Sequence, residues 1–154
     1  MLVFHIQTNC QMKPKLVKAA ETLRDQVNAN YPDRDKTSDG WVADARHLAR
    51  GNSDHIPDNE GWVCAIDIDR DLSGKPKPDI MGDLADQLRI AARDGDNRIK
   101  YIIFDGRIAS RILNFKWRAY KGSNAHRHHC HVSFNKKQSV ADGSLFKIPM
   151  LGAK

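Results

Sequence analysis

The chain concentrates histidine in one short stretch near its carboxyl end. The segment NAHRHHCHVSF, residues 124 to 134, holds four of the seven histidines: His126, His128, His129 and His131. Imidazole side chains bind metal ions, and they exchange protons near neutral pH because their unperturbed pKa is ~6.5. The first hypothesis for this stretch is therefore metal-assisted or acid–base chemistry.

The last part of this segment, HCHVSF, has the alternation of a β-strand. Side chains at every second position share a face, so His129, His131 and Ser133 lie together and Cys130 points the other way. Two imidazoles on one face can meet one metal ion, or one metal ion and its reacting water. A catalytic zinc site takes three nitrogen, oxygen or sulfur ligands and leaves a fourth position open for water, so a third ligand is needed.

The stretch SDHIPDNEGWVCAIDID, residues 53 to 69, supplies candidates for that ligand. His55 lies in a loop, and Asp67 lies on the expected strand WVCAIDID. Asp69 shares the face of Asp67 and is an alternative ligand. A loop histidine, a strand carboxylate and a strand histidine from the far end of the chain can converge across neighbouring strands.

These residues need a scaffold, and the periodicity of the chain predicts one. Apolar spacing predicts amphipathic helices over residues 15–28 and 80–93. Strands are expected over 62–69 and 129–134, and KYIIFDGRIAS predicts a hairpin that turns at Asp105 and Gly106. Residues 31–60 predict a long ordered loop or a short helix. This order indicates an α+β fold with a small antiparallel sheet and flanking helices.

Length and composition favour one compact domain over residues 1–154. The net charge of +6 favours an anionic partner such as nucleic acid, an anionic membrane surface or a wall polymer. No RNA-binding motif is present and the basic residues are scattered, so a nucleic-acid partner is not expected. The amino terminus lacks the features of a secretory signal and no run is long enough to span a membrane. We expect synthesis in the cytoplasm without membrane insertion, which the odd number of cysteines fits.

Two motifs together resemble a known family of zinc peptidases. Ser53-x-His55, then Gly61 and Ala65-x-Asp67, resembles the first signature of the peptidases that group lysostaphin, D-Ala-D-Ala carboxypeptidases and the hedgehog fold. The closing His126-x-x-His129-x-His131 is similar to their terminal H-x-H motif, in the form found in the penicillin-insensitive murein endopeptidase and many phage lysins. The likeness to phage-encoded peptidoglycan peptidases extends over roughly residues 15–134, which leaves 135–154 as a tail.

The resemblance implies a role for each matched residue. His55, Asp67 and His131 would hold one zinc ion per chain. His129 would lie beside the open coordination position and act with His126 as the catalytic pair. Ser53 and Arg50 would lie near the substrate. The resemblance favours Asp67 over Asp69 as the ligand, and it implies a hedgehog-like or D,D-peptidase-like fold.

The chain departs from the family pattern in two places. The segment IPDNEGWVCAI makes the loop between His55 and Asp67 longer than usual. The glutamate of the E-x-x-H motif in many relatives is absent, because His128 lies three residues before His131. Histidine would then be the acid–base group, which suits its pKa.

The implied function is zinc-dependent hydrolysis of an amide bond in the stem peptides or cross-links of peptidoglycan. The setting would be a monomeric phage endolysin, made in the host cytoplasm and released to the cell wall with the help of a holin. A virion-associated wall enzyme is an alternative setting. A catalytically inactive zinc-containing wall-binding or interaction domain is an alternative function, and a metal- or nucleic-acid-binding domain is a third.

Other conspicuous residues have simpler interpretations. His5 and His47 are expected to be structural and His128 to face solvent. Cys64 and Cys130 are expected to point away from the ligand face into the core. Trp117 and Tyr120 either flank a substrate groove or pack in the core.

Overall fold

The structure is a computed structural model that describes residues 12–43 and 53–152. Its elements follow in the order β1 (Lys15–Leu16), α1 (Lys18–Asn30), β2 (Trp62–Val63), β3 (Ala65–Asp69), α3 (Met81–Arg93), β4 (Ile99–Phe104), β5 (Arg107–Ser110), the 3-10 helix η1 (Ile112–Phe115), β6 (Arg118–Ala119), β7 (His129–Phe134), α4 (Lys136–Ser139) and the 3-10 helix η2 (Pro149–Leu151).

The main sheet has five strands in the order β3-β7-β4-β5-β6, and all of its pairings are antiparallel. The last strand of the chain, β7, therefore lies between β3 and β4. This insertion brings the histidine-rich strand beside the strand that carries Asp67. The prediction of an α+β domain with an antiparallel sheet and flanking helices is confirmed.

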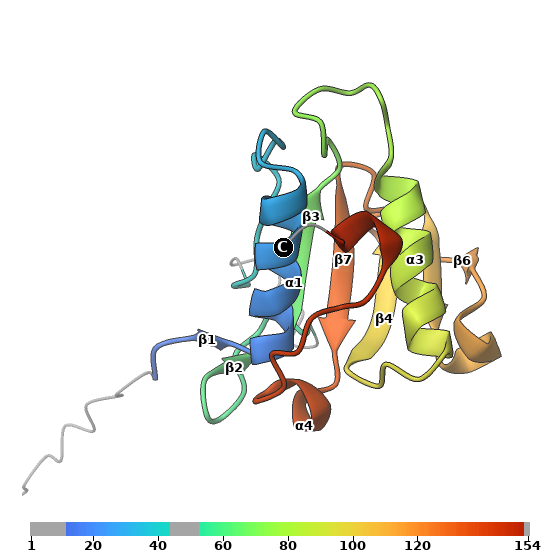
Figure 1. The fold of residues 1–154 in the computed structure, drawn as a ribbon. Helices are drawn as coiled ribbons and strands as arrows, with labels where there is room; N and C mark the ends of the chain where they lie inside the picture. Colours follow the sequence, from blue (N-terminus) through green and yellow to red (C-terminus); the bar gives the residue numbers. More distant parts are fainter. Residues whose placement is uncertain (1–11, 44–52, 153–154) are drawn as a thin grey trace, which may run out of the picture.

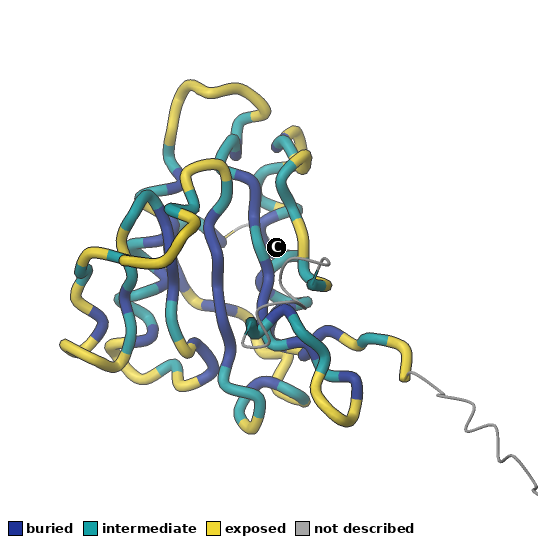
Figure 2. Tube along the Cα trace, turned by 180° about the vertical axis from the view of Figure 1, so that it is seen from behind, coloured by how far each residue is buried: buried dark blue, intermediate teal, exposed yellow. Residues whose placement is uncertain are grey.

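Helices α1 and α3 lie across one face of this sheet (Figure 1), where α1 packs on β3 and α3 on β4. Their apolar stripes and the inward side chains of the strands are buried together, among them Leu23, Leu84, Leu88, Ile66, Ile102 and Val132. Seen from the opposite side, the central strands contain long buried stretches and the connecting loops are exposed (Figure 2). Because strand residues alternate, Asp67, His129 and His131 project from the face that these two helices do not cover.

Two predicted elements begin three residues too early, for a common reason. The first helix begins at Lys18 rather than Lys15, because Lys15 and Leu16 pair in parallel with Trp62 and Val63. The predicted strand 62–69 divides at Cys64, whose N–H donates to the carbonyl of Asp54. Trp62 and Val63 thus belong to a separate two-stranded sheet. Both boundaries depend on contacts between residues far apart in the sequence, which local periodicity does not predict.

The predicted hairpin is confirmed, with its turn at Asp105 and Gly106. Phe104 pairs with Arg107, and both turn residues have positive φ, 54° and 77°. That backbone suits a two-residue type I′ turn, for which Asp-Gly is a favoured sequence.

The segment after β7 contributes to the core. Phe146, Ile148 and Leu151 are buried. The amide of Gln26 on α1 donates to the carbonyls of Phe146 and Leu151, and its oxygen accepts the N–H of Phe146. The predicted tail of residues 135–154 therefore packs against α1 through Phe146 and Leu151. None of the described helices combines the length and apolarity needed to cross a membrane.

Candidate metal centre

The centre begins with a cross-strand pair. Asp67 on β3 lies directly opposite His131 on β7, and Ile103 on β4 is the partner of His131 on its other side. Facing residues of antiparallel strands have Cβ atoms only ~5 Å apart, so the two side chains meet above the sheet. The Asp67 Oδ1 atom lies 3.0 Å from Nδ1 of His131.

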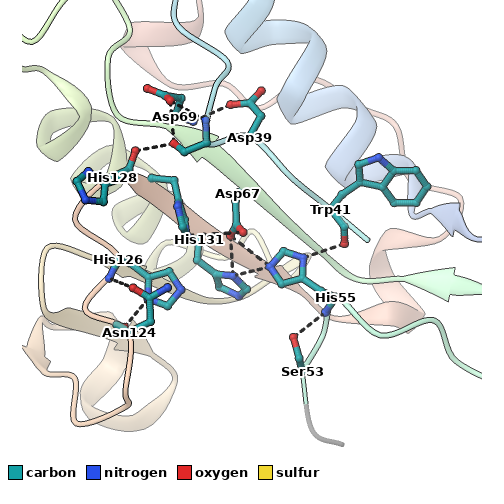
Figure 3. A network of polar contacts seen from close by, with 12 residues as sticks. Asp39, Trp41, Ser53, His55, Asp67, Asp69, Asn124, His126, His128 and His131 are labelled. Atoms are coloured by element: carbon teal, nitrogen blue, oxygen red, sulfur yellow. Dashed lines mark hydrogen bonds and ion pairs between the residues drawn. The ribbon is translucent and has the colours of Figure 1, made fainter. Parts of the chain in front are cut away.

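His55 completes a compact triangle of donor atoms (Figure 3). Its Nε2 atom lies 3.2 Å from Asp67 Oδ1 and 3.1 Å from His131 Nδ1. Donor atoms about 2.1 Å from a tetrahedral zinc are separated by roughly 3.4 Å, so the three observed spacings are close to those of a ligand set. His55 and His131 are both buried, with 4% and 5% exposure, and Asp67 is half-buried.

The loop that carries His55 is held by backbone contacts. Its Nδ1 lies 2.8 Å from the carbonyl of Trp41, and its own carbonyl accepts the N–H of Ala43. Because a carbonyl only accepts, Nδ1 carries the proton and Nε2 presents a lone pair to the triangle when the ring is neutral. Trp41 follows Gly40, which makes an antiparallel bridge with Asp67 on the edge of β3 that faces away from β7. The β3 edge therefore positions both ligands.

His131 is oriented from behind by Ser133 and Tyr101. Its Nε2 atom lies 2.7 Å from Ser133 Oγ, on the same face of β7. The ring of Tyr101 stacks on that of His131, with 5.5 Å between centroids. Such outer contacts fix which nitrogen of a histidine faces a metal ion.

The triangle requires a positive charge. Asp67 Oδ1 only accepts, His55 Nε2 has a lone pair in the neutral ring, and His131 Nδ1 has one when its Nε2 donates to Ser133. Three lone pairs about 3 Å apart repel one another unless a proton or a metal ion lies among them. Neutral imidazole and carboxylate are the donors that zinc accepts, so the residues present fit a divalent transition metal.

The protonation equilibria reflect the same charge requirement. Burial raises the pKa of the Asp67 carboxyl, but hydrogen bonds from His131 and His55 outweigh it and hold that pKa well below its usual range. Burial opposes the charged form of His55, yet the hydrogen bond and charge of Asp67 raise its pKa overall. Burial lowers the pKa of His131. In the protein without a metal ion, Asp67 is ionised. Of the two histidines in the triangle, His55 is the one whose protonated form the Asp67 carboxylate stabilises.

His129 and His126 lie beside the other oxygen of Asp67. His129 Nε2 is 3.6 Å from Asp67 Oδ2. The ring of His126 lies edge-on to those of His129 and His131, with centroids 5.1 Å and 5.4 Å away. His126 Nδ1 lies 2.8 Å from the carbonyl of Asn124, so Nδ1 is the donor and Nε2 has the lone pair. Burial and the charge of His131 lower the pKa of His126 to about 4.

His126 is also held in an uncommon backbone conformation. Its φ of 54° lies in the left-handed region, which is energetically unfavourable for a residue that has a Cβ atom. Its N–H donates to the Asn124 side chain, which supports the turn. Tyr120 borders the ring of His126, with centroids 5.8 Å apart. The β6–β7 loop thus fixes the position of His126.

The alternative ligand Asp69 has a different task. Its Oδ2 accepts the N–H and the hydroxyl of Ser38, and its Oδ1 accepts the N–H of Asp71. The N–H of Asp69 donates to Asp39, which forms a bidentate ion pair with the buried Arg34. Asp69 therefore anchors the segment that leads to Trp41 and is not part of the ligand triangle.

The remaining predicted residues are distributed as follows. Ser53 Oγ accepts the N–H of His55, so it lies beside the ligand loop. Arg50 lies outside the described residues, as do His5 and His47. His128 is exposed as expected, and Cys130 is in the core. Trp117 donates its indole N–H to Asp86 of α3 and packs against the core.

Several residues of the centre were missed by sequence reasoning. The carbonyl of Trp41 carries no side-chain signal, and the contact of Tyr101 with His131 depends on β4 lying next to β7. Ser133 was placed on the strand face of His131, and its contact with the His131 ring is what the sequence pattern left unassigned.

Comparisons with protein-family models, with curated proteins and with solved structures found no match to this chain.

Proposed function

We propose that this chain is a zinc-dependent peptidase that hydrolyses an amide bond in the stem peptides or cross-links of peptidoglycan. The observation that carries the proposal is the triangle of His55, Asp67 and His131, with two further histidines beside the second oxygen of Asp67. A purely structural metal site is closed by a fourth protein ligand, whereas a catalytic site keeps one position open. Here the imidazoles of His126 and His129, which are suited to proton transfer, lie beside the ligand triangle.

The geometry supports a ligand role for each member of the triangle. His55 would bind through Nε2, His131 through Nδ1 and Asp67 through Oδ1. A zinc ion held there supplies Lewis acidity that polarises the substrate carbonyl and acidifies water. The protein holds its ligands in place through Trp41 and Ser133, and the buried surroundings strengthen the electrostatic interactions.

The two remaining histidines divide the proton chemistry. His126 Nε2 has its lone pair available at neutral pH, so it accepts a proton from the attacking water and returns it to the leaving amine nitrogen as the C–N bond breaks. His129 donates a hydrogen bond to the oxygen on which negative charge develops. His129 Nε2 lies 3.6 Å from Asp67 Oδ2, beside the ligand triangle.

The choice of substrate rests on two further points. The two histidine- and aspartate-bearing motifs resemble those of lysostaphin-type and D-Ala-D-Ala carboxypeptidase-type enzymes, whose hedgehog-like architecture this α+β domain would share. The positive charge of the chain suits an anionic wall polymer. In this proposal the protein is a phage endolysin that acts as a monomer on the host wall after holin-assisted release.

The test measures zinc content together with turbidity loss of purified peptidoglycan. The wild type and His128→Ala, a control at an exposed neighbouring histidine, should bind zinc and clear the suspension. His131→Ala should lose both properties, and His129→Ala should keep zinc but lose hydrolysis.

Two results would contradict the proposal. Zinc binding without hydrolysis by the wild type would favour the inactive wall-binding or interaction domain, whereas wild-type hydrolysis unaffected by zinc removal would remove the metal from the mechanism. Mass spectrometry of the released fragments identifies which amide bond is cleaved.

A further inference from the structure

A second group of potential ligands adjoins the first. Asp67, His126 and His129 each offer a donor atom, and these atoms lie within 4.8 Å of one another. Asp67 belongs to both groups: Oδ1 faces His55 and His131, and Oδ2 faces His129. A carboxylate with one oxygen turned to each group is the geometry of a bridging ligand in two-metal centres.

We propose that a second divalent transition-metal ion binds to Asp67 Oδ2, His126 and His129, more weakly than the first, and that its binding inhibits the enzyme. The His126 ring has a nitrogen available to bind this ion, because Nδ1 donates to the Asn124 carbonyl and Nε2 is left with its lone pair. The hydrogen bond to a carbonyl is also the usual support for a metal-binding imidazole.

The second site is the weaker one for two physical reasons. His129 Nδ1 is buried without a hydrogen-bond partner among the described residues, so binding through Nε2 would place an N–H at an unsatisfied position. The second ion also repels the first across the shared carboxylate. By contrast, His55 and His131 each have a partner for the nitrogen that faces away from the triangle.

Inhibition follows from the shared residues, and this part of the inference rests on the proposed peptidase function. A metal ion at His126 Nε2 removes the lone pair that accepts the proton. The same ion occupies the His129 nitrogen that faces the developing oxyanion. Metal binding at this second site is independent of whether the protein cleaves peptidoglycan.

Equilibrium dialysis of the full chain against Zn²⁺ tests the binding. The wild type should take up one equivalent at low free zinc and a second at higher free zinc. His126→Asn and His129→Asn should each retain the first equivalent and weaken the second by at least ~100-fold, since the loss of a ligand exceeds the loss of an outer-shell partner. Asn suits position 126 because it tolerates a positive φ.

Matched controls separate this site from others. His128→Asn, at the exposed neighbouring histidine, should bind both equivalents. His55→Asn should weaken the tight equivalent and leave the weak one. A single equivalent at every zinc concentration, or a second that persists in both His126→Asn and His129→Asn, would overturn the site.

The inhibitory role is measured separately. Hydrolysis of peptidoglycan by the wild type should rise with the first equivalent of zinc and fall as the second binds. Full activity of the two-zinc form would refute the inhibitory role but not the existence of the second site. Absence of hydrolysis at every zinc level would refute the proposed function, and the dialysis result would still decide whether the second site exists.

Discussion

Asp67 and His131 face each other across β3 and β7, with 3.0 Å between Oδ1 and Nδ1. The carboxylate is the common partner of His55, His131 and His129, so it neutralises whatever cation lies among them. Asp67→Asn keeps the shape but removes the charge and one strong ligand. We expect it to lose zinc binding at both groups and all hydrolytic activity, as measured by dialysis and turbidity. Retention of stoichiometric zinc would show that the carboxylate is not a ligand.

Ser133 tests whether the contacts behind the ligands matter. Ser133→Ala removes the partner of His131 Nε2 without touching the zinc-binding atoms. We expect about a 10–100-fold loss of zinc affinity, the usual effect of losing such a partner, measured by competition with a chromophoric chelator. Ser73→Ala, at a half-buried serine of the β3–α3 connection whose hydroxyl donates to the carbonyl of Lys75, is the control and should leave the affinity unchanged.

Zinc should stabilise the fold because its ligands come from distant parts of the chain. At free zinc 1,000 times the dissociation constant, binding contributes about 4 kcal/mol. For a chain of this size that corresponds to a rise in Tm on the order of 10 °C. Thermal unfolding with zinc and with a chelator measures the difference, and His131→Ala should show almost none. Equal Tm values for the wild type under both conditions would contradict a native-state metal site.

Arg34 supports the centre from a distance. Its side chain is 1% exposed, and its guanidinium pairs with Asp39, which accepts the N–H of Asp69 on β3. Arg34→Ala leaves a partly buried carboxylate unpaired, so we expect a loss of about 3 kcal/mol in the free energy of unfolding. The control is Arg24, whose side chain is 38% exposed and whose ion pair with Asp25 spans 3.9 Å; Arg24→Ala should change stability by less than about 0.5 kcal/mol. Denaturant titration measures both.

The metal-free protein should lose stability between about pH 6.5 and pH 4 partly through His126. Burial lowers the folded-state pKa to about 4, below the unfolded value of ~6.5. In that window the unfolded chain binds more protons, so stability present above pH 6.5 is lost as the pH falls. The effect is on the order of 1 kcal/mol because the ring is partly exposed. His126→Asn in a chelator should flatten the pH profile by that amount, and an identical slope would refute the assignment.

Much of the scaffold was readable from local sequence. The helix of residues 81–93 has its own apolar stripe, and the hairpin has a turn dipeptide whose backbone preference selects it. The strand 129–134 was found with its bounds because alternating histidine and apolar residues mark two faces. Where an element depends on a distant partner, as at Lys15 and Cys64, local periodicity gave the wrong boundary.

For the centre, the sequence by itself determined which chemistry is available: imidazoles and a carboxylate at strand spacing. Only the tertiary structure decided how they meet, because β7 enters between β3 and β4 and sets Asp67 opposite His131. It also separated the two aspartates that alternation had placed on one face. Asp67 lies opposite His131 and beside His55, while Asp69 lies where the N–H groups of Ser38 and Asp71 satisfy it. A period-two pattern fixes the direction of a side chain, and the partner it meets depends on how the chain folds around it.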